Sequence, residues 1–155
     1  MMAKSWKNST GKIFELREVV SIIENFPAAQ IHVGTDSHFK TGYLIYASVI
    51  AIHQPGICAR YFFRRTKNTS RKEKTPLKSR LMKEVQDSIE IANTLRNLVG
   101  QDRNICVHAD ISENEKNRSS VVCEQAKNWI IGMGFDFKLK PISWASSSIA
   151  DLHAK

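Results

Sequence analysis

The hydrophobic pattern changes period near residue 77, and this change restricts the possible folds more than any other feature of the chain. Residues 31–36, 43–52 and 57–63 are rich in β-branched and aromatic side chains and are joined by short turns, as in antiparallel strands. From Leu77 to Val99, apolar residues instead recur at helical spacing, and Gly100 follows. Local strand pairing followed by helices predicts a mixed sheet covered by helices.

Shorter elements flank these segments. The pattern predicts a first helix over residues 14–26, capped by Ser9 and Thr10 and ended by Pro27. After Gly100 it predicts a strand over 105–109, a helix over 121–131, a strand over 135–139 and a last helix over 149–155. This order resembles the ribonuclease-H-like fold, a five-stranded α/β sheet, here with an extra N-terminal helix. We expect one domain over residues 1–155, with residues 1–10 flexible.

Charge and composition indicate the kind of partner. The chain has 155 residues, and its 23 Lys and Arg against 15 Asp and Glu give a net charge of +8. Such an excess favours a polyanion, most often nucleic acid. The longest apolar runs are too short to cross a bilayer, the N-terminus does not resemble a secretory signal, and the three cysteines form no CxxC pair. We therefore expect a cytoplasmic protein that does not associate with membranes.

Four acidic residues lie where the predicted elements could converge. Asp36 ends the first strand and Asp110 ends the fourth. A right-handed crossover would make these strands parallel, so both residues would leave the same edge of the sheet. Glu84 borders the apolar face of the long helix, and Asp151 lies in the first turn of the last helix. Any one of them alone could be an ordinary surface or turn residue, but together they predict an acidic site.

Clustered carboxylates repel one another and raise one another's pKa, so they persist mainly where a cation compensates for them. Hard oxygen ligands suit Mg²⁺ or Mn²⁺ better than Zn²⁺. Two such ions about 4 Å apart can activate water and stabilise the leaving oxygen in phosphodiester cleavage. The acidic cluster therefore predicts a site for Mg²⁺ or Mn²⁺ with two ions.

Four motifs carry a more specific resemblance: GTDSH, RLMKEVQDSIEIA, ICVHAD and KPISWASSSIAD. In this order, over about residues 11–155, they resemble the bacterial YkuK-type family of ribonuclease-H-like proteins. The resemblance implies that Asp36, Glu84, Asp110 and Asp151 occupy the acidic positions of the ribonuclease H superfamily site. The chain departs from the family in having His38 in place of a usual Gln, and residues 111–115 in place of a glycine-containing turn.

A basic segment could hold the substrate. Residues 64–74 contain six basic residues and one acidic residue, and the predicted topology places them at the acidic edge. We expect phosphate contacts from a set of five basic residues in this segment, although a solvated charged loop is the usual alternative. The set is Arg64, Arg65, Lys67, Arg71 and Lys72. His153, near Asp151, is a weaker candidate for proton transfer or phosphate contact.

Three functions fit these features. The leading interpretation is a metal-dependent nuclease that hydrolyses RNA, DNA or a hybrid through the four carboxylates. The alternative is a nucleic-acid-binding protein on the same fold that does not cut. A sugar-kinase-like or actin-like nucleotide enzyme shares the sheet core but needs two such domains, which 155 residues supply only in a dimer.

Overall fold

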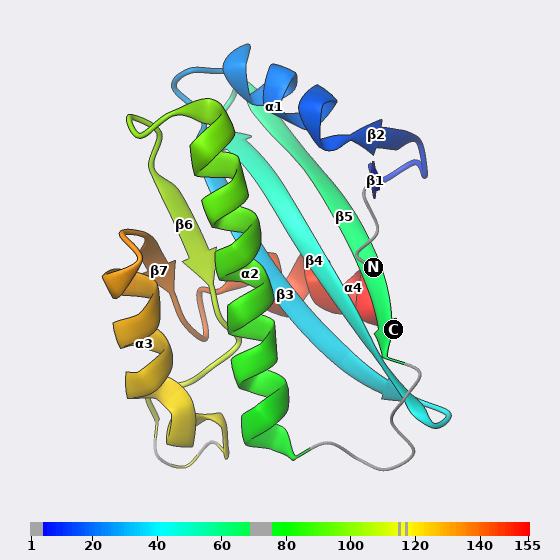
Figure 1. Cartoon of the computed structure of the whole chain (residues 1–155), viewed down its shortest axis with the longest axis vertical. Coiled ribbons are helices and arrows are strands. Elements are labelled where there is room, and N and C mark those ends of the chain that lie inside the picture. Colours follow the sequence, from blue (N-terminus) through cyan, green and yellow to red (C-terminus); the bar gives the residue numbers. More distant parts are fainter. Residues whose placement is uncertain (1–4, 69–75, 115, 117) are drawn as a thin grey trace.

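A seven-stranded mixed sheet, in the order β2-β1-β5-β4-β3-β6-β7, forms the centre of the computed structural model (Figure 1). The structure describes residues 5–68, 76–114, 116 and 118–155. The strands are β1 (Ser5–Lys7), β2 (Ile13–Glu15), β3 (Gln30–Lys40), β4 (Tyr43–Gln54), β5 (Cys58–Asn68), β6 (Ile105–His108) and β7 (Asp136–Lys138). The helices are α1 (Leu16–Glu24), α2 (Leu77–Val99), the 3-10 helix η1 (Arg118–Val122), α3 (Cys123–Gly132), the π-helix η2 (Ala145–Ala150) and α4 (Asp151–Ala154). Among the described residues, no helix combines the length and hydrophobicity that crossing a bilayer requires.

The strand pairing confirms the expected mixed α/β sheet. β3, β4 and β5 form an antiparallel meander, and β6 then pairs in parallel with β3, from Ile31 opposite Ile105 to Gly34 opposite His108. β7 pairs in parallel with β6. The sheet has two strands more than the five predicted, because β1 and β2 form a hairpin that joins the edge of β5.

The N-terminal segment also differs from the prediction. Residues 5–10 are not a flexible tail, since Trp6 on β1 is only 2% exposed and the Arg64 guanidinium lies 4.7 Å from its ring centroid. The first helix begins at Leu16, and its N-terminus is capped by Glu15 and Glu18 in a capping box, not by Ser9 or Thr10. Buried Trp6 anchors this hairpin. The hairpin was not predicted because a strand of three residues is too short to show an alternating pattern.

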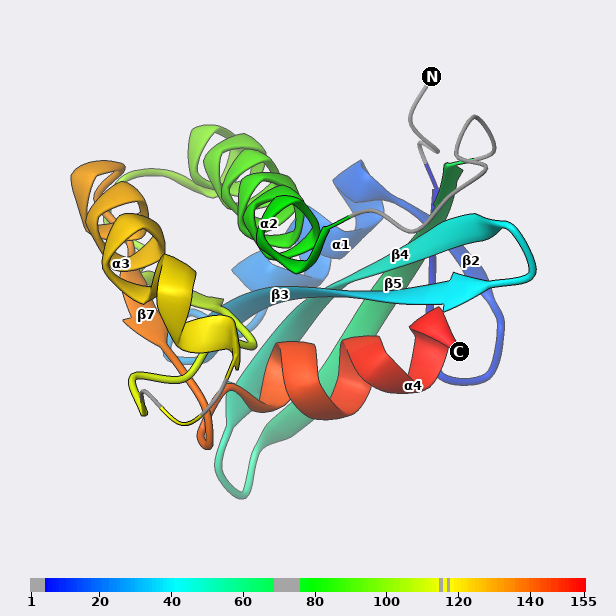
Figure 2. The same ribbon diagram turned by 90° about the horizontal axis from the view of Figure 1, so that it is seen from below.

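The two faces of the sheet carry different layers. Side chains alternate along β3, so Ile31 and Val33 join the main core, and Thr35 and Ser37 hydrogen-bond to Ser88 and Glu84 of α2. The opposite face is covered by η2 and α4 (Figure 2) over a smaller apolar cluster that includes Val49, Ala51 and Ala150. β3 is therefore sandwiched between α2 and the C-terminal helical segment.

Gly34 lets the C-terminal segment approach β3 closely. A Cβ atom at this position would lie 2.7 Å from the Ser146 amide nitrogen and 2.9 Å from the Ala145 carbonyl carbon. Both neighbours are backbone atoms, so they cannot move aside as a flexible side chain would. The helical segment also begins at Ala145, earlier than the predicted start at Ile149.

Replacing Gly34 with Ala should push η2 away from β3. We expect Gly34→Ala to lower the free energy of unfolding by about 1–3 kcal/mol, as overpacked sites do, measured by urea denaturation. Gly132→Ala is the matched control, because a Cβ there meets nothing within 4 Å, and helix propensity favours Ala by up to about 1 kcal/mol. Equal stability of the two variants would contradict the close approach at Gly34.

Candidate functional site

Asp36 and Asp110 occupy equivalent positions on neighbouring parallel strands. Gly34 pairs with His108 at the last step of the β3–β6 ladder, and each aspartate follows two residues later. Asp36 does not end its strand as predicted, because β3 continues to Lys40 along β4. Beyond Gly34, however, β3 has no strand partner on the β6 side, so both carboxylates lie where that edge opens. The predicted convergence of these two strands is thus present.

Asp151 is the first residue of α4, which covers the face of the sheet opposite α2, and its carboxyl group contacts that of Asp36. The two carboxyl groups share a hydrogen bond, which requires a proton on one of them. Burial raises the pKa of Asp36 to about 7, and the hydrogen bond to Asp151 and the negative charge of Asp110 raise it as well. Burial alone would raise the pKa of Asp151, but hydrogen bonds from Lys155 and Asp36 hold it below its usual value. Asp36 therefore carries the shared proton.

Two lysines compensate for the neighbouring charges. The Lys155 ammonium lies 2.9 Å from Asp151 Oδ2, and the Lys140 ammonium lies 3.4 Å from Asp110 Oδ1. Lys140 is within ion-pair range of that buried oxygen but makes no hydrogen bond to it. The spacing of Asp151 and Lys155, four residues apart on a helix, is visible in the sequence, whereas the proximity of Lys140 to Asp110 depends on the packing of β7.

Glu84 approaches the same edge from the opposite face. Ser37 donates a hydrogen bond to its carboxylate, and Arg80 donates to the backbone carbonyl of Ser37. Burial raises the pKa of Glu84 well above its usual value, and the charges of Asp36 and Asp110 add to this effect. Because Asp36 and Ser37 are adjacent residues of one strand, their side chains point to opposite faces. Glu84, bound to Ser37, and Asp36 therefore lie on opposite sides of β3.

The oxygen atoms of these carboxylates are of the kind that a hard divalent cation prefers. The pair of Asp36 and Asp151 can hold a cation in place of its shared proton, and Asp110 Oδ1 is a buried oxygen without a hydrogen-bond partner. Mg²⁺ commonly takes only one or two carboxylates, with waters and substrate phosphates completing its coordination. No three of the four carboxylates offer oxygens that all lie within 4.8 Å of one another, although all four belong to the described residues. A two-ion arrangement stays a prediction.

The predicted basic run is divided between the two faces of the sheet, because β5 extends to Asn68 instead of ending at residue 63. Arg64 packs over Trp6 on the α2 face, where it lies near the acidic residues Asp87 and Glu90. Arg65 and Lys67 are exposed on the face that carries Asp36. Arg71 and Lys72 lie outside the described residues.

Two further residues on that face were missed by the sequence analysis. A cavity of about 330 Å³ is lined by Lys40, Tyr43, Ile45, Arg65, Thr66 and Lys67. Lys40 lies within residues 37–42, which were predicted to form a turn, and Tyr43 is the first residue after that turn. Extending the strand alternation past Asp36 would have placed Lys40 on the same face as Asp36.

His153 is held in a packing arrangement. Its Nε2 atom is 3.0 Å from the Tyr61 hydroxyl, and its ring stacks on Phe63 with centroids 3.6 Å apart. Burial lowers the pKa of His153, with a smaller effect from Arg65. These contacts favour a role in docking α4 on β5 over the proton transfer considered from sequence.

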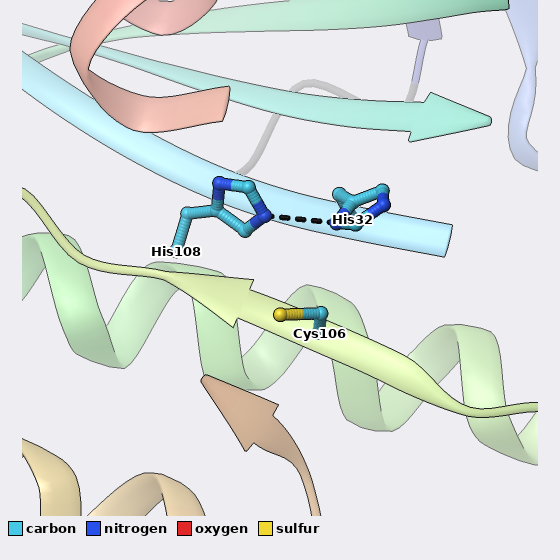
Figure 3. A group of neighbouring side chains, drawn as sticks. All are labelled: His32, Cys106 and His108. Carbon is cyan, nitrogen blue, oxygen red and sulfur yellow. Dashed lines mark hydrogen bonds between the residues drawn. The ribbon is translucent and has the colours of Figure 1, made fainter. Parts of the chain in front are cut away.

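Another cluster offers nitrogen and sulfur atoms. Among the described residues, the one group of three potential metal ligands with atoms mutually within 4.8 Å is His32, Cys106 and His108 (Figure 3). Sequence spacing gave no sign of it, because Cys106 and His108 are brought to His32 by the parallel pairing of β6 with β3.

The hydrogen bonds of this cluster fix its protons. The Ala145 amide donates to His108 Nδ1 over 3.0 Å, so this nitrogen carries no proton. His108 Nε2, 2.8 Å from His32 Nδ1 (Figure 3), is therefore the protonated atom and the donor. A protonated nitrogen cannot ligate a metal, and metal-bound histidines ordinarily donate through their second nitrogen instead of accepting. The hydrogen bonds of the two histidines instead anchor the start of η2 to β6 and β3.

Nitrogen NMR of the imidazoles tests this assignment. Burial lowers the pKa of His32 to about 4 and that of His108 to about 3, so at pH 6 both rings should be neutral and protonated at Nε2. Added Zn²⁺ should leave their ¹⁵N shifts unchanged. A Zn²⁺-induced shift of both rings, with His108 protonated at Nδ1, would show that the cluster is a metal site.

Comparisons with known proteins agree with the fold. A search among curated proteins found no match to the chain. Among protein families, the Ribonuclease H-like family matches residues 16–155, which include every strand from β3 onward and all four carboxylates. Since this match covers most of the sequence, the chain belongs to the Ribonuclease H-like family.

Proposed function

We propose that this protein is a divalent-metal-dependent nuclease that hydrolyses phosphodiester bonds in RNA, DNA or a hybrid. The observation that carries the proposal is the carboxyl pair of Asp36 and Asp151, which shares a proton beside Asp110 at the open edge of β3. The family is associated with nucleic acid, and the net charge of +8 suits a polyanionic substrate.

Asp36, Asp110 and Asp151 would hold Mg²⁺ or Mn²⁺. The bound ion would lower the pKa of a water molecule and neutralise charge on the phosphodiester. Asp36 would give up its proton when the cation binds, because a positive charge favours the ionised carboxylate. Glu84, fixed by Ser37, would add negative charge from the α2 side and is proposed as the fourth ligand.

A nucleic-acid-binding protein that does not cut is the second candidate. It is favoured by one observation: Lys140 and Lys155 already pair with Asp110 and Asp151, so these acids are balanced without a cation. In that case the acidic residues would stabilise the fold through these ion pairs and would have no catalytic role.

Activity of variants separates the two candidates. Asp36→Asn and Asp110→Asn should each lower Mn²⁺-dependent cleavage of mixed RNA and DNA substrates about 100-fold or more. Metal-ion stabilisation of the transition state is worth several kcal/mol, and about 1.4 kcal/mol corresponds to a tenfold change in rate. Cleavage is measured with labelled oligonucleotides, with and without chelator.

Glu84→Gln should impair cleavage strongly, whereas Glu90→Gln is the matched control, since Glu90 is exposed on the same helix. Full activity of Asp36→Asn, or no cleavage by the wild type under any of these conditions, would reject the nuclease and leave the binding protein.

Thermal stability tests the cation site independently of activity. The raised pKa of Asp36 means that the folded state holds a proton more tightly than the unfolded chain. Stability from this group is therefore lost as the pH rises from about 4 through about 7. In chelator at pH 8, Asp36→Asn should melt higher than the wild type by about 3 °C or more, because Asn keeps a donor for Asp151 without a charge.

The same melts at pH 5 should show a smaller difference, because wild-type Asp36 is then mostly protonated. Millimolar Mg²⁺ should stabilise the wild type by mass action and stabilise Asp36→Asn much less. Equal shifts of both proteins with Mg²⁺, and no gain in chelator, would mean that Asp36 is not part of a cation site.

A further inference from the structure

The C-terminal helix leaves part of the acidic face of the sheet uncovered. His32, Gly34 and Asp36 lie buried beneath η2 and α4, whereas His38 and Lys40, farther along the same side of β3, are exposed. In Figure 2 the strands continue past the end of α4 toward the β3–β4 hairpin. The open surface therefore begins next to the carboxyl pair.

Cross-strand pairing connects this open surface to the acidic site. Asp36, Ala47 and Arg65 form one row across β3, β4 and β5, and His38, Ile45 and Lys67 form the next. Residues of one row point to the same face, and Asp36 and Arg65 are separated by two strand spacings, about 10 Å. Phosphate bound at Arg65 would place a neighbouring phosphodiester of the same strand near the carboxylates.

The cavity of about 330 Å³ on this surface has the chemistry of a nucleotide site. Lys40, Arg65 and Lys67 supply three positive charges, Ile45 forms an apolar part of the wall, and the described residues that line the cavity include no acidic one. Tyr43 adds an aromatic ring, with the Lys67 ammonium 3.9 Å from the ring centroid. Basic grooves with aromatic platforms are typical of proteins that bind single strands.

We propose that this cavity binds one nucleotide of a single-stranded nucleic acid, with its phosphate at Arg65 and Lys67 and its base against Tyr43. The inference rests on the proposed nuclease and names its substrate class. The volume of the cavity lies at the lower end of the range for ligand-binding sites. A base within a duplex would have to leave the stack to enter it, at a cost of a few kcal/mol, so the cavity selects single strands or frayed ends.

Binding in chelator tests the inference without cleavage. Fluorescence anisotropy of a labelled single strand and of a duplex should show the single strand bound about tenfold more tightly. The double variant Arg65→Gln/Lys67→Gln should weaken single-strand binding about tenfold or more and lower the logarithmic salt slope by about 1.4, since each phosphate contact contributes about 0.7. Tyr43→Leu should weaken it about fivefold or more.

The matched control is Lys12→Gln/Arg17→Gln, which removes the same charge from the connection between β1 and β2 and from α1, at two residues that do not line the cavity. It should change binding by no more than about twofold, because both residues are exposed and neither belongs to the cavity wall. Equal losses in the control and site variants, tighter binding of the duplex, or no effect of Tyr43→Leu would each overturn the inference.

The two proposals can fail separately. If the wild type binds single strands through these residues but cleaves nothing with Mn²⁺, the nuclease is wrong and the nucleotide site stands. If Mn²⁺-dependent cleavage requires Asp36 but is unaffected by Arg65→Gln/Lys67→Gln and Tyr43→Leu, the nucleotide site is wrong and the nuclease stands.

Discussion

The hydrogen bond between Asp36 and Asp151 is the interaction on which the acidic site depends. Two carboxyl groups can remain in contact only with a proton between them or a cation beside them. The close approach of the C-terminal segment at Gly34 and the anchoring of Ala145 on His108 position α4 over Asp36. The packing of this face thus holds together two acids that repel each other when both are ionised.

Strand alternation explains why the basic residues do not act as one loop. On β5, Arg64 turns to the α2 face and packs on Trp6, while Arg65 and Lys67 remain exposed on the acidic face. A single strand thus supplies both a structural arginine and two cations on the face that carries Asp36. Negative charge is recessed under α4, and positive charge lies on the open sheet beyond it.

Much of the fold could be predicted because periodicity reports burial directly. The apolar spacing located α2 at Leu77–Val99, and the handedness of crossovers correctly placed Asp110 beside Asp36. The pairing of β1 with β5 was not predictable, because three-residue strands carry too little alternation. Lys140 and the His32–His108 contact depend on register between distant strands, which no local pattern contains. The helical spacing predicted that Glu84 lies beside the apolar face of α2. Its hydrogen bond with Ser37 was not predictable, because it depends on β3 continuing past Asp36.

The most direct test is a carbon-detected NMR titration of the aspartate carboxyl groups in the metal-free protein. We predict a pKa of about 7 for Asp36, a pKa below the ordinary range for Asp151, and loss of the Asp36 transition near neutral pH when Mg²⁺ is added. An Asp36 carboxyl group that titrates near the ordinary value of 3.8, with no response to Mg²⁺, would contradict it.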